Sequence, residues 1–312
     1  MTTNFILVSD DNYTKNLGIC TYSVLHNMCP AVEHVRIFIM DCGITEENKA
    51  KLRRQAARFD NAEMIFFPIS AMLDEVTPKE DARWHRAIYG RLFFPRLMEQ
   101  YPDIDRLLYL DCDVIVDGSL TELFEMNMDG KVIAGVADSS DRERKAALDI
   151  PPESPYINSG VLVIDTARWN ALDVSQRTID YINRIPEELL LPDQDAINYI
   201  LQGQIKVLPP DYNLMWMLTD RDIPKLLRNI PHLAYTEEEV RHALHHGKIY
   251  HYAAHDMWSF DGITPIHARR FIKYHNLSDW RGEKRKFQNL RHFFTWLIFT
   301  FKRMATGDFW KD

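Results

Sequence analysis

Two aspartates, Asp111 and Asp113, lie one residue apart in an otherwise apolar run over residues 107–116. An unpaired buried carboxylate is costly, so we expect this run to end at a rim where the carboxylates meet a cation. In an extended strand both side chains would project to the same face. There they could share one Mg²⁺ or Mn²⁺, ions that prefer oxygen ligands. The alternative is an acidic turn at a strand end, because Asp117 and Gly118 follow closely.

The elements that would position these aspartates follow from the pattern of apolar runs. Stretches typical of strands alternate with helical patterns along most of the chain. The expected strands are residues 5–8, 35–40, 63–67, 107–116, 132–137, 160–165, 205–208 and 248–252. Helices are expected at about residues 14–27, from residue 45, at about 89–99, at 192–201 and beyond 266. This alternation predicts an α/β fold with a mostly parallel, Rossmann-like sheet flanked by helices.

A second acidic pair, Asp10 and Asp11, follows the first expected strand. Ligands of open α/β sheets bind beyond the carboxyl ends of the strands, so we expect the two acidic pairs to share one site. The chain contains neither of the common glycine-rich nucleotide loops. Any bound phosphate must therefore be held by a metal and side chains. Residues 138–155 are polar and contain prolines, which predicts a mobile loop beside the site.

The composition limits the class of protein. The 312 residues are 46% hydrophobic and carry a formal net charge of −8. These values indicate a soluble globular protein and argue against nucleic-acid binding, which requires a basic surface. The four cysteines show no zinc-ligand spacing and are typical of a reduced cytosol. The first residues do not resemble a signal peptide, and no apolar run reaches the ~18 residues of a membrane span.

Six short motifs occur in a fixed order along roughly residues 4–260. They are VSDDNY at 8–13, YGRL at 89–92, YLDCD at 109–113, YINSGV at 156–161, DQD at 193–195 and YHY at 250–252. This ordered set resembles the retaining glycosyltransferases of family eight, the group of glycogenin and bacterial lipopolysaccharide galactosyl- and glucosyltransferases. The resemblance implies a GT-A fold, a UDP-sugar donor and a bound Mn²⁺, or Mg²⁺ in its place.

The resemblance also implies roles for individual residues. Those implied to bind the UDP-sugar are Asp10, Asn12, Tyr13, Arg91, Asp111, Cys112, Asp113 and His255. The implied metal ligands are Asp111, Asp113 and His251. Those implied to hold the transferred sugar and line the reacting face are Asn158, Asp193 and Gln194. A lone histidine in an apolar strand is usually a core residue, so only the resemblance makes His251 a ligand. Tyr13 is implied to stack on the base, with packing on the first helix as the alternative.

The implied chemistry is the departure of UDP from the anomeric carbon of a sugar. Negative charge grows on the diphosphate as the bond breaks, and a divalent cation stabilises that charge. Retention requires attack from the face that the leaving group vacates, or two successive inversions. Gln194 is a neutral amide and a poor nucleophile. We therefore favour same-face substitution, with Asp193 and Gln194 positioning the donor.

One segment departs from the family pattern. Where the family usually has His-x-x-Gly-x-x-Lys-Pro-Trp, this chain has Ala254 in place of the glycine and Met257 in place of the lysine, and the proline is missing. The family lysine grips the diphosphate. We expect His255 to take over part of that role, because a protonated imidazole can pair with phosphate.

The C-terminal part of the chain differs in composition from the rest. We expect a GT-A catalytic domain over residues 1–265 and a helical, basic tail over 266–312. Residues 281–303 combine seven Lys/Arg residues with many aromatic and aliphatic ones. This mixture is typical of a helix that lies on an anionic membrane, and the alternative is a helix packed on the domain. The predicted location is the cytoplasm, peripheral on the inner face of a bacterial plasma membrane.

Three functions are compatible with these patterns. The favoured one is a Mn²⁺-dependent retaining transferase that moves glucose or galactose from a UDP-sugar to a cell-surface glycan such as lipopolysaccharide. The second is a catalytically weak or inactive sugar-nucleotide-binding relative, suggested by the altered segment at Ala254–Met257. The third is a metal-dependent phosphohydrolase that uses Asp111 and Asp113, for which the sequence offers no second cluster of metal ligands.

Overall fold

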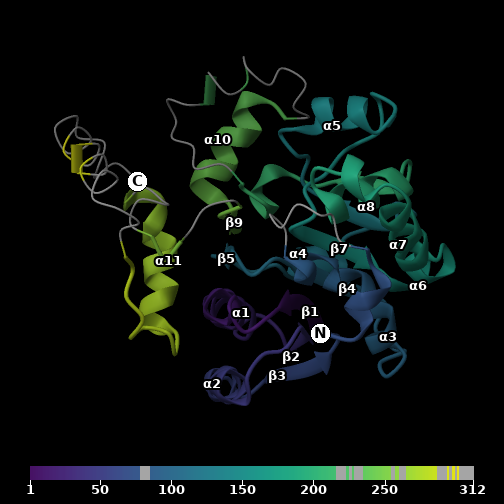
Figure 1. Cartoon of the computed structure of the whole chain (residues 1–312). Coiled ribbons are helices and arrows are strands. Elements are labelled where there is room, and N and C mark those ends of the chain that lie inside the picture. Colours follow the sequence, from purple (N-terminus) through teal and green to yellow (C-terminus); the bar gives the residue numbers. More distant parts are fainter. Residues whose placement is uncertain are drawn as a thin grey trace.

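The computed structural model describes residues 1–77, 85–215, 223–224, 227, 235–253, 257–259, 265–286, 294, 297–298 and 301. Within these, helices flank a seven-stranded sheet of order β3-β2-β1-β4-β7-β6-β8 (Figure 1). The strands of this sheet are β1 (Thr2–Ser9), β2 (His34–Asp41), β3 (Ala62–Pro68), β4 (Arg106–Leu110), β6 (Ile133–Gly135), β7 (Val161–Asp165) and β8 (Ile205–Val207). A second sheet pairs β5 (Val114–Val116) with β9 (Ile249–His251).

The helices fall mainly between successive strands. The α-helices are α1 (Thr14–Met28), α2 (Glu46–Ala56), α3 (Phe94–Met98), α4 (Thr121–Glu125), α5 (Asp141–Ala147), α6 (Thr166–Ala171), α7 (Val174–Arg184), α8 (Pro192–Ile200), α10 (Glu237–His246) and α11 (Pro265–Leu277). Short 3₁₀ segments are η1 (Met72–Glu75), η2 (Arg86–Phe93), η3 (Pro186–Glu188) and η4 (Pro210–Tyr212). The helix expected at about 89–99 is thus a 3₁₀ segment that continues into α3.

The large sheet is mostly parallel, as predicted. Strand β1 pairs in parallel with β2 and β4, β2 with β3, and β6 with β8. Strand β7 runs antiparallel to its neighbours β4 and β6. The strand order reverses direction between β1 and β4. This is the position where open α/β sheets form their ligand crevice, beyond the carboxyl ends of the strands.

Successive side chains along a strand pack into two different hydrophobic cores, one on each face of the sheet. Phe5 and Leu7 of β1 pack in one core with Leu17 of α1. Ile6, between them, packs in the opposite core with Trp169 of α6. Side chains that alternate with period two produce this arrangement. The sheet is buried on both faces, which holds its strand ends in fixed positions.

The run over residues 107–116 is not the single strand that we expected. Strand β4 ends at Leu110, the chain turns at Asp111–Asp113, and β5 begins at Val114 in the other sheet. The expectation that alternation along one strand aligns the two aspartates is therefore wrong. They come together because the backbone turns between two sheets.

The segment over residues 138–155 also differs from the prediction of a mobile loop. It contains α5, and the side chain of Arg144 on this helix is buried against Asp195 of α8. The polar sequence suggested a loop. The ion pair that holds this helix joins residues distant in the chain, so it leaves no local sequence pattern. The helix is attached beside the carboxyl ends of the strands.

Helix α11 lies alongside α1 (Figure 1). Its residues Ala268, Phe271 and Tyr274 are fully buried and belong to the same core as α1. Asp117, after β5, accepts hydrogen bonds from Arg270, Lys273 and Tyr274 of α11. The predicted division at residues 265 and 266 stays a prediction. None of the helices in the described part of the chain has the length and hydropathy that a bilayer span requires.

Candidate active site

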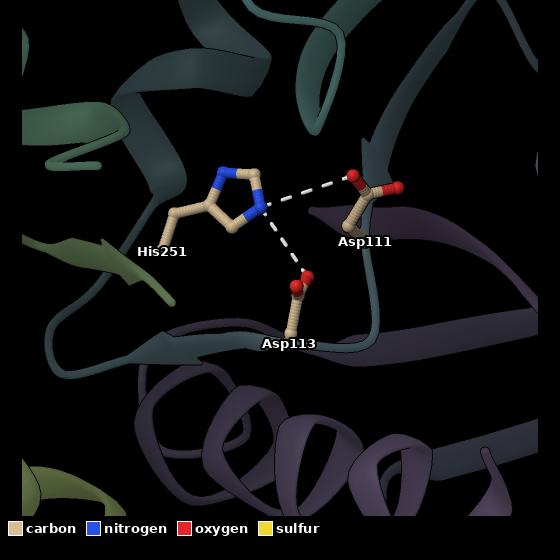
Figure 2. A group of neighbouring side chains, drawn as sticks. All are labelled: Asp111, Asp113 and His251. Atoms are coloured by element: carbon tan, nitrogen blue, oxygen red, sulfur yellow. Dashed lines mark ion pairs between the residues drawn. The ribbon is translucent and has the colours of Figure 1, made fainter. Parts of the chain in front are cut away.

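A histidine and two aspartates converge at the carboxyl end of β4. Nε2 of His251 lies 3.3 Å from Oδ1 of Asp113 and 3.9 Å from Oδ2 of Asp111. Figure 2 shows the imidazole facing both carboxylates across the aspartate turn. One potential ligand atom from each residue lies within 4.8 Å of the others. Two carboxylate oxygens and one imidazole nitrogen suit Mn²⁺ or Mg²⁺.

The pairing of β5 with β9 brings the histidine to the aspartates. Val114 lies opposite His251 in this antiparallel ladder, and the amide N–H of Tyr252 donates to the carbonyl of Asp113 at 3.0 Å. His251 therefore sits next to the aspartate turn although it is far away along the chain. The register of two short strands determines the ligand set.

The orientation of the imidazole is set by an amide. Nδ2 of Asn213 donates to Oδ1 of Asn158 at 2.9 Å, so its Oδ1 is left to accept from Nδ1 of His251 at 3.0 Å. With the proton on Nδ1, the lone pair of Nε2 points toward the carboxylates. Such outer contacts orient the histidine ligands of metal sites.

A glycine keeps the space between the three ligands open. A Cβ atom at Gly160 would lie 2.2 Å from Cε1 of His251 and 2.7 Å from Oδ2 of Asp111. Any other residue would displace both side chains. The donor atoms, the histidine orientation and this open space together fit a divalent cation.

Burial and charge act in opposite directions on the pair of Asp113 and His251. Burial would raise the pKa of Asp113, but the imidazolium of His251 lowers it below its ordinary value. Burial would lower the pKa of His251, but Asp113 and Asp111 raise it. A metal ion needs the lone pair of Nε2, so metal binding competes with protonation of His251 at this nitrogen.

Arg91, at 6% exposure, connects the aspartate turn to the first turn of α8. Its Nη2 donates to Oδ1 of Asp111 at 2.8 Å, and its Nε lies 3.1 Å from Oδ2 of Asp193. Its Nη1 donates to the carbonyl of Ser159 at 2.6 Å, and the guanidinium covers the ring of Tyr109. Burial raises the pKa of Asp193, and Arg91 opposes that rise.

The amide of Gln194 is fully hydrogen-bonded. Its Oε1 accepts from the amide N–H of Ser159 at 3.0 Å and from Nδ2 of Asn158 at 3.1 Å. Its Nε2 donates to Oδ2 of Asp138 at 3.1 Å and to the hydroxyl of Tyr156 at 3.2 Å. These four hydrogen bonds fix the orientation of the amide. Gln194 can position a group but has no ionisable nucleophile.

A buried ion pair supports the first turn of α8. Arg144 donates from Nε to Oδ1 of Asp195 at 3.0 Å and from Nη2 to Oδ2 at 2.5 Å. The same carboxylate accepts from the hydroxyl of Tyr156 and from the amide N–H groups of Leu190 and Leu191. Asp195 is fully buried. It anchors the start of α8, next to Asp193 and Gln194.

A cavity of about 390 Å³ lies between these groups. All three residues implied to hold the sugar line it, as do the three implied metal ligands and Arg91. The lining residues are Ile88, Arg91, Asp111, Asp113, Asp138, Ser139, Asn158, Ser159, Leu191, Asp193, Gln194, Met215, His251 and Ala253. Sequence reasoning missed Asp138, Ser139, Ser159 and the supporting Asn213. Asp138 follows an expected strand, which could have pointed to it, whereas Asn213 carries no local signal.

The residues implied to bind uridine lie at the end of β1, outside the lining of that cavity. Oδ1 of Asp10 accepts from the amide N–H of Tyr13 at 2.9 Å, and Oδ2 accepts from Nδ2 of Asn12 at 3.3 Å. Tyr13 is 43% exposed. Asp11 instead accepts from the amide and hydroxyl of Thr45 and supports α2.

Cys112 and His255 were also predicted to bind the donor, and the structure describes only Cys112. Cys112 is 4% exposed, its Sγ donates to the carbonyl of Val8 at 3.1 Å, and burial raises its pKa, so the thiol stays protonated. Its side chain ties the aspartate turn to the end of β1. His255 lies outside the described residues, so its role stays a prediction. Met257 is 1% exposed and brings no charge to the surface.

Comparison with known proteins agrees with this fold. Residues 4–255 match the profile of Glycosyl transferase family 8, and the chain belongs to this family. The family resemblance seen in the sequence motifs is thereby confirmed. Solved structures show the GT-A fold, among them a galactosyltransferase, LgtC, in complex with donor and acceptor sugar analogs. Its TM-score is 0.70 at 23% identity, over 91% of this chain and 100% of LgtC.

Two curated relatives illustrate the range of similar proteins. General stress protein A of Bacillus subtilis is 31% identical over 212 residues, which cover 67% of this chain and 73% of the relative. Lipopolysaccharide 1,2-glucosyltransferase of Escherichia coli strain K12 is 30% identical over 213 residues, 67% of this chain and 61% of the relative. The chain thus spans about three fifths of the glucosyltransferase. The protein is a glycosyltransferase by family.

Proposed function

We propose that this protein is a retaining hexosyltransferase that moves glucose or galactose from a UDP-sugar to a cell-surface glycan such as lipopolysaccharide. The proposed cofactor is Mn²⁺, or Mg²⁺ in its place, bound by Asp111, Asp113 and His251. The observation that carries this proposal is the position of those three ligand atoms, within 4.8 Å of one another, at the rim of a cavity that Asp193 and Gln194 also line.

The cation would supply electrostatic stabilisation of the departing diphosphate, without proton transfer. The protein's own residues have complementary tasks. Arg91 holds Asp111 and Asp193 in place at once and thereby sets the distance between the metal ligands and the sugar site. Asn158 and Gln194 present fixed amides to the cavity. A neutral amide at Gln194 supports same-face substitution, because an amide is a poor nucleophile and forms no stable ester with the sugar.

The donor would extend from the end of β1 to the cavity. Asp10, Asn12 and Tyr13 are the proposed uridine-binding residues, and the 43% exposure of Tyr13 leaves its ring accessible for stacking. The proposed glycan acceptor is supported by the names of relatives, which include a lipopolysaccharide 1,2-glucosyltransferase. The chain covers only 61% of that relative, so the choice of hexose, acceptor and linkage belongs to this proposal.

Activity measurements test the proposal and separate its alternatives. UDP release from UDP-glucose and UDP-galactose would be measured with MnCl₂, with EDTA, and with or without lipopolysaccharide. We expect acceptor-stimulated UDP release that EDTA abolishes, and retained anomeric configuration in the product by NMR. Asp113→Asn should reduce turnover at least about a hundredfold, on the scale of other charge-stabilising groups. Asp103→Asn, an exposed aspartate of the α3–β4 connection, is the matched control and should leave turnover unchanged.

The other possible results of these measurements would support a different function or a different mechanism. Tight UDP-sugar binding without turnover would indicate the sugar-nucleotide-binding relative, which the buried, uncharged Met257 favours. Release of inorganic phosphate would indicate the phosphohydrolase. An inverted product would contradict the retaining mechanism, and a sugar ester trapped on a side chain would contradict same-face substitution.

The proposed location is the cytoplasm, on the inner face of the plasma membrane. The described tail residues support membrane contact: Phe294, Ile298 and Phe301 are helical in backbone and 58%, 57% and 62% exposed. Their sequence spacing of four and three residues is that of side chains on one face of a helix. Basic residues in the same segment would complement anionic lipid, which adds about 1 kcal/mol for each Lys or Arg near the surface.

A further inference from the structure

A chain of buried amide side chains connects the sugar side of the cavity to the histidine of the metal site. Nδ2 of Asn158 donates to Oε1 of Gln194 at 3.1 Å, and Nδ2 of Asn213 donates to Oδ1 of Asn158 at 2.9 Å. Asn213 in turn contacts Nδ1 of His251 at 3.0 Å. None of these four residues is more than 9% exposed. Because water has little access, each polar group must find its partner within the chain.

Two backbone amides set the direction of the bonds in this chain, because a peptide N–H can only donate. The N–H of Ser159 donates to Oε1 of Gln194 at 3.0 Å, and the N–H of Gly160 donates to Oδ1 of Asn158 at 2.9 Å. Both of these side-chain oxygens are therefore acceptors, and the NH₂ groups of Asn158 and Asn213 supply the donors. Asn213 thus uses its nitrogen on the sugar side and has its oxygen for the next contact.

The backbone holds Asn213 beside the metal ligand. Leu214, the next residue, pairs with Tyr250 of β9 in a parallel bridge. Its N–H donates to the carbonyl of Ile249 at 2.9 Å, and its carbonyl accepts from the N–H of His251 at 3.0 Å. These bonds fix the place of the Asn213 side chain, and the side-chain hydrogen bonds must then decide the direction of its amide.

An asparagine orients an imidazole only if its own amide is held. The amide oxygen accepts, the amide nitrogen donates, and a half-turn about the last side-chain bond exchanges the two. Turned in this way, Asn213 would present its NH₂ group to Nδ1 of His251, and the ring proton would move to Nε2, the atom that faces the two aspartates. A metal ion needs the lone pair of that nitrogen. The contact of Asn213 with Oδ1 of Asn158 disfavours this turned state.

We propose that Asn213 is a positioning residue that makes metal binding at His251 depend on the orientation of Asn158. This assignment rests on the proposed function, which gives His251 the role of a metal ligand and Asn158 a place at the transferred sugar. The dependence is reciprocal, because coupling between two sites acts equally in both directions. A cation at His251 stabilises the orientation in which Asn158 holds its oxygen toward Asn213, and a change in that orientation alters the affinity for the cation.

A double-mutant cycle with Asn213→Asp tests this dependence. The carboxylate has the shape of the amide, but both of its oxygens accept, so it presents an acceptor to His251 in either direction and needs no anchor. Dissociation constants for Mn²⁺ would be measured by calorimetry, without nucleotide, for the wild type, Asn158→Ala, Asn213→Asp and the double variant. Asn158→Ala should weaken Mn²⁺ binding about tenfold in the wild type, the scale of a lost outer contact, and should not weaken it in the Asn213→Asp background.

Two further variants separate positioning from general stability. Asn213→Ala removes the acceptor and should weaken Mn²⁺ binding about 10–100-fold, whereas Asn213→Asp keeps it and should bind Mn²⁺ at least as tightly as the wild type. Asn61→Ala is the matched control, because Asn61 also donates two hydrogen bonds, to backbone carbonyls away from the site, and it should keep wild-type Mn²⁺ affinity.

Three results would overturn the assignment. Equal losses from Asn158→Ala in both backgrounds, or no loss in either, would show that Asn213 does not transmit the effect of Asn158. Equal losses in Asn213→Ala and Asn213→Asp would show that the acceptor does not matter. In both cases the wild type still binds Mn²⁺ and the proposed function stands, whereas a wild type that binds no Mn²⁺ would overturn the proposed metal site and this assignment together.

Discussion

At the scale of single residues, the site depends on groups whose chemistry is fixed by their neighbours. The imidazole of His251 is oriented by Asn213, and the amide of Gln194 by hydrogen bonds on all sides. Asp111 and Asp113 are only partly buried, and buried Arg91 binds Asp111 and Asp193. Of these residues, Gly160 is the one whose role depends on the absence of a side chain.

Gly160→Ala should abolish most metal binding without unfolding the protein. The added Cβ would overlap Cε1 of His251 and Oδ2 of Asp111 and push two ligands apart. We expect Mn²⁺ affinity, measured by calorimetry, to fall about 10–100-fold, the range seen when the surroundings of metal ligands are altered. Gly282→Ala is the control, because a Cβ there meets nothing within 4 Å. Equal Mn²⁺ affinity in the two variants would contradict the proposed ligand set.

At the scale of elements, short segments rather than long helices position the chemistry. The turn between β4 and β5 carries the aspartates, three-residue β9 carries His251, and the first turn of α8 carries Asp193 and Gln194. Helix α5 reaches the same place and is attached to α8 by the pair of Arg144 and Asp195. The position of α8 therefore depends on a helix that does not itself carry a proposed catalytic group.

Arg144→Met should destabilise the protein and displace the start of α8. Removal of one partner leaves Asp195 buried without its cation, which costs about 3–5 kcal/mol. We expect that loss in the free energy of unfolding from urea melts, together with a lower kcat at little change in UDP affinity. Arg96→Met is matched, because Arg96 forms a two-pronged pair with Glu75 at the surface, worth about 0–1 kcal/mol. Similar losses in both variants would show that the buried pair has no special role.

At the scale of the whole molecule, the sheet and helix α11 share one hydrophobic core. The sheet is buried on both faces and holds the strand ends at one edge. Helix α11 joins the same core, so the segment after it starts from a fixed position. Under the proposed function, a tail attached in this way would orient the proposed site toward an acceptor at the membrane.

Replacement of the exposed tail residues should release the protein from membranes. The variant Phe294→Ser/Ile298→Ser/Phe301→Ser removes the apolar face and keeps every basic residue. We expect it to lose sedimentation with vesicles that contain phosphatidylglycerol and to keep UDP release from the donor. Leu172→Ser changes a leucine that is 38% exposed between α6 and α7 and should sediment like the wild type. Sedimentation of the triple variant at wild-type levels would contradict membrane contact through this face.

Much of the fold could be predicted from the sequence, because apolar period and turn residues are local signals. The first three strands and the position of α8 follow directly from them. The prediction failed where a contact between distant residues overrides the local pattern. The apolar run of residues 107–116 divides between two sheets because β5 pairs with β9, and the polar segment of residues 138–155 folds into α5, which Arg144 attaches to Asp195.

The sequence by itself determined the family, the order of the strands along the chain and the types of residue available for chemistry. Only the tertiary structure decided which of them meet. Asp111, Asp113 and His251 converge through a turn and a strand register, and Asp138 and Asn213 join the site through side-chain hydrogen bonds that no sequence spacing predicts. The physical reason is that composition and periodicity act locally, whereas strand pairing and buried ion pairs join residues that are distant in the chain.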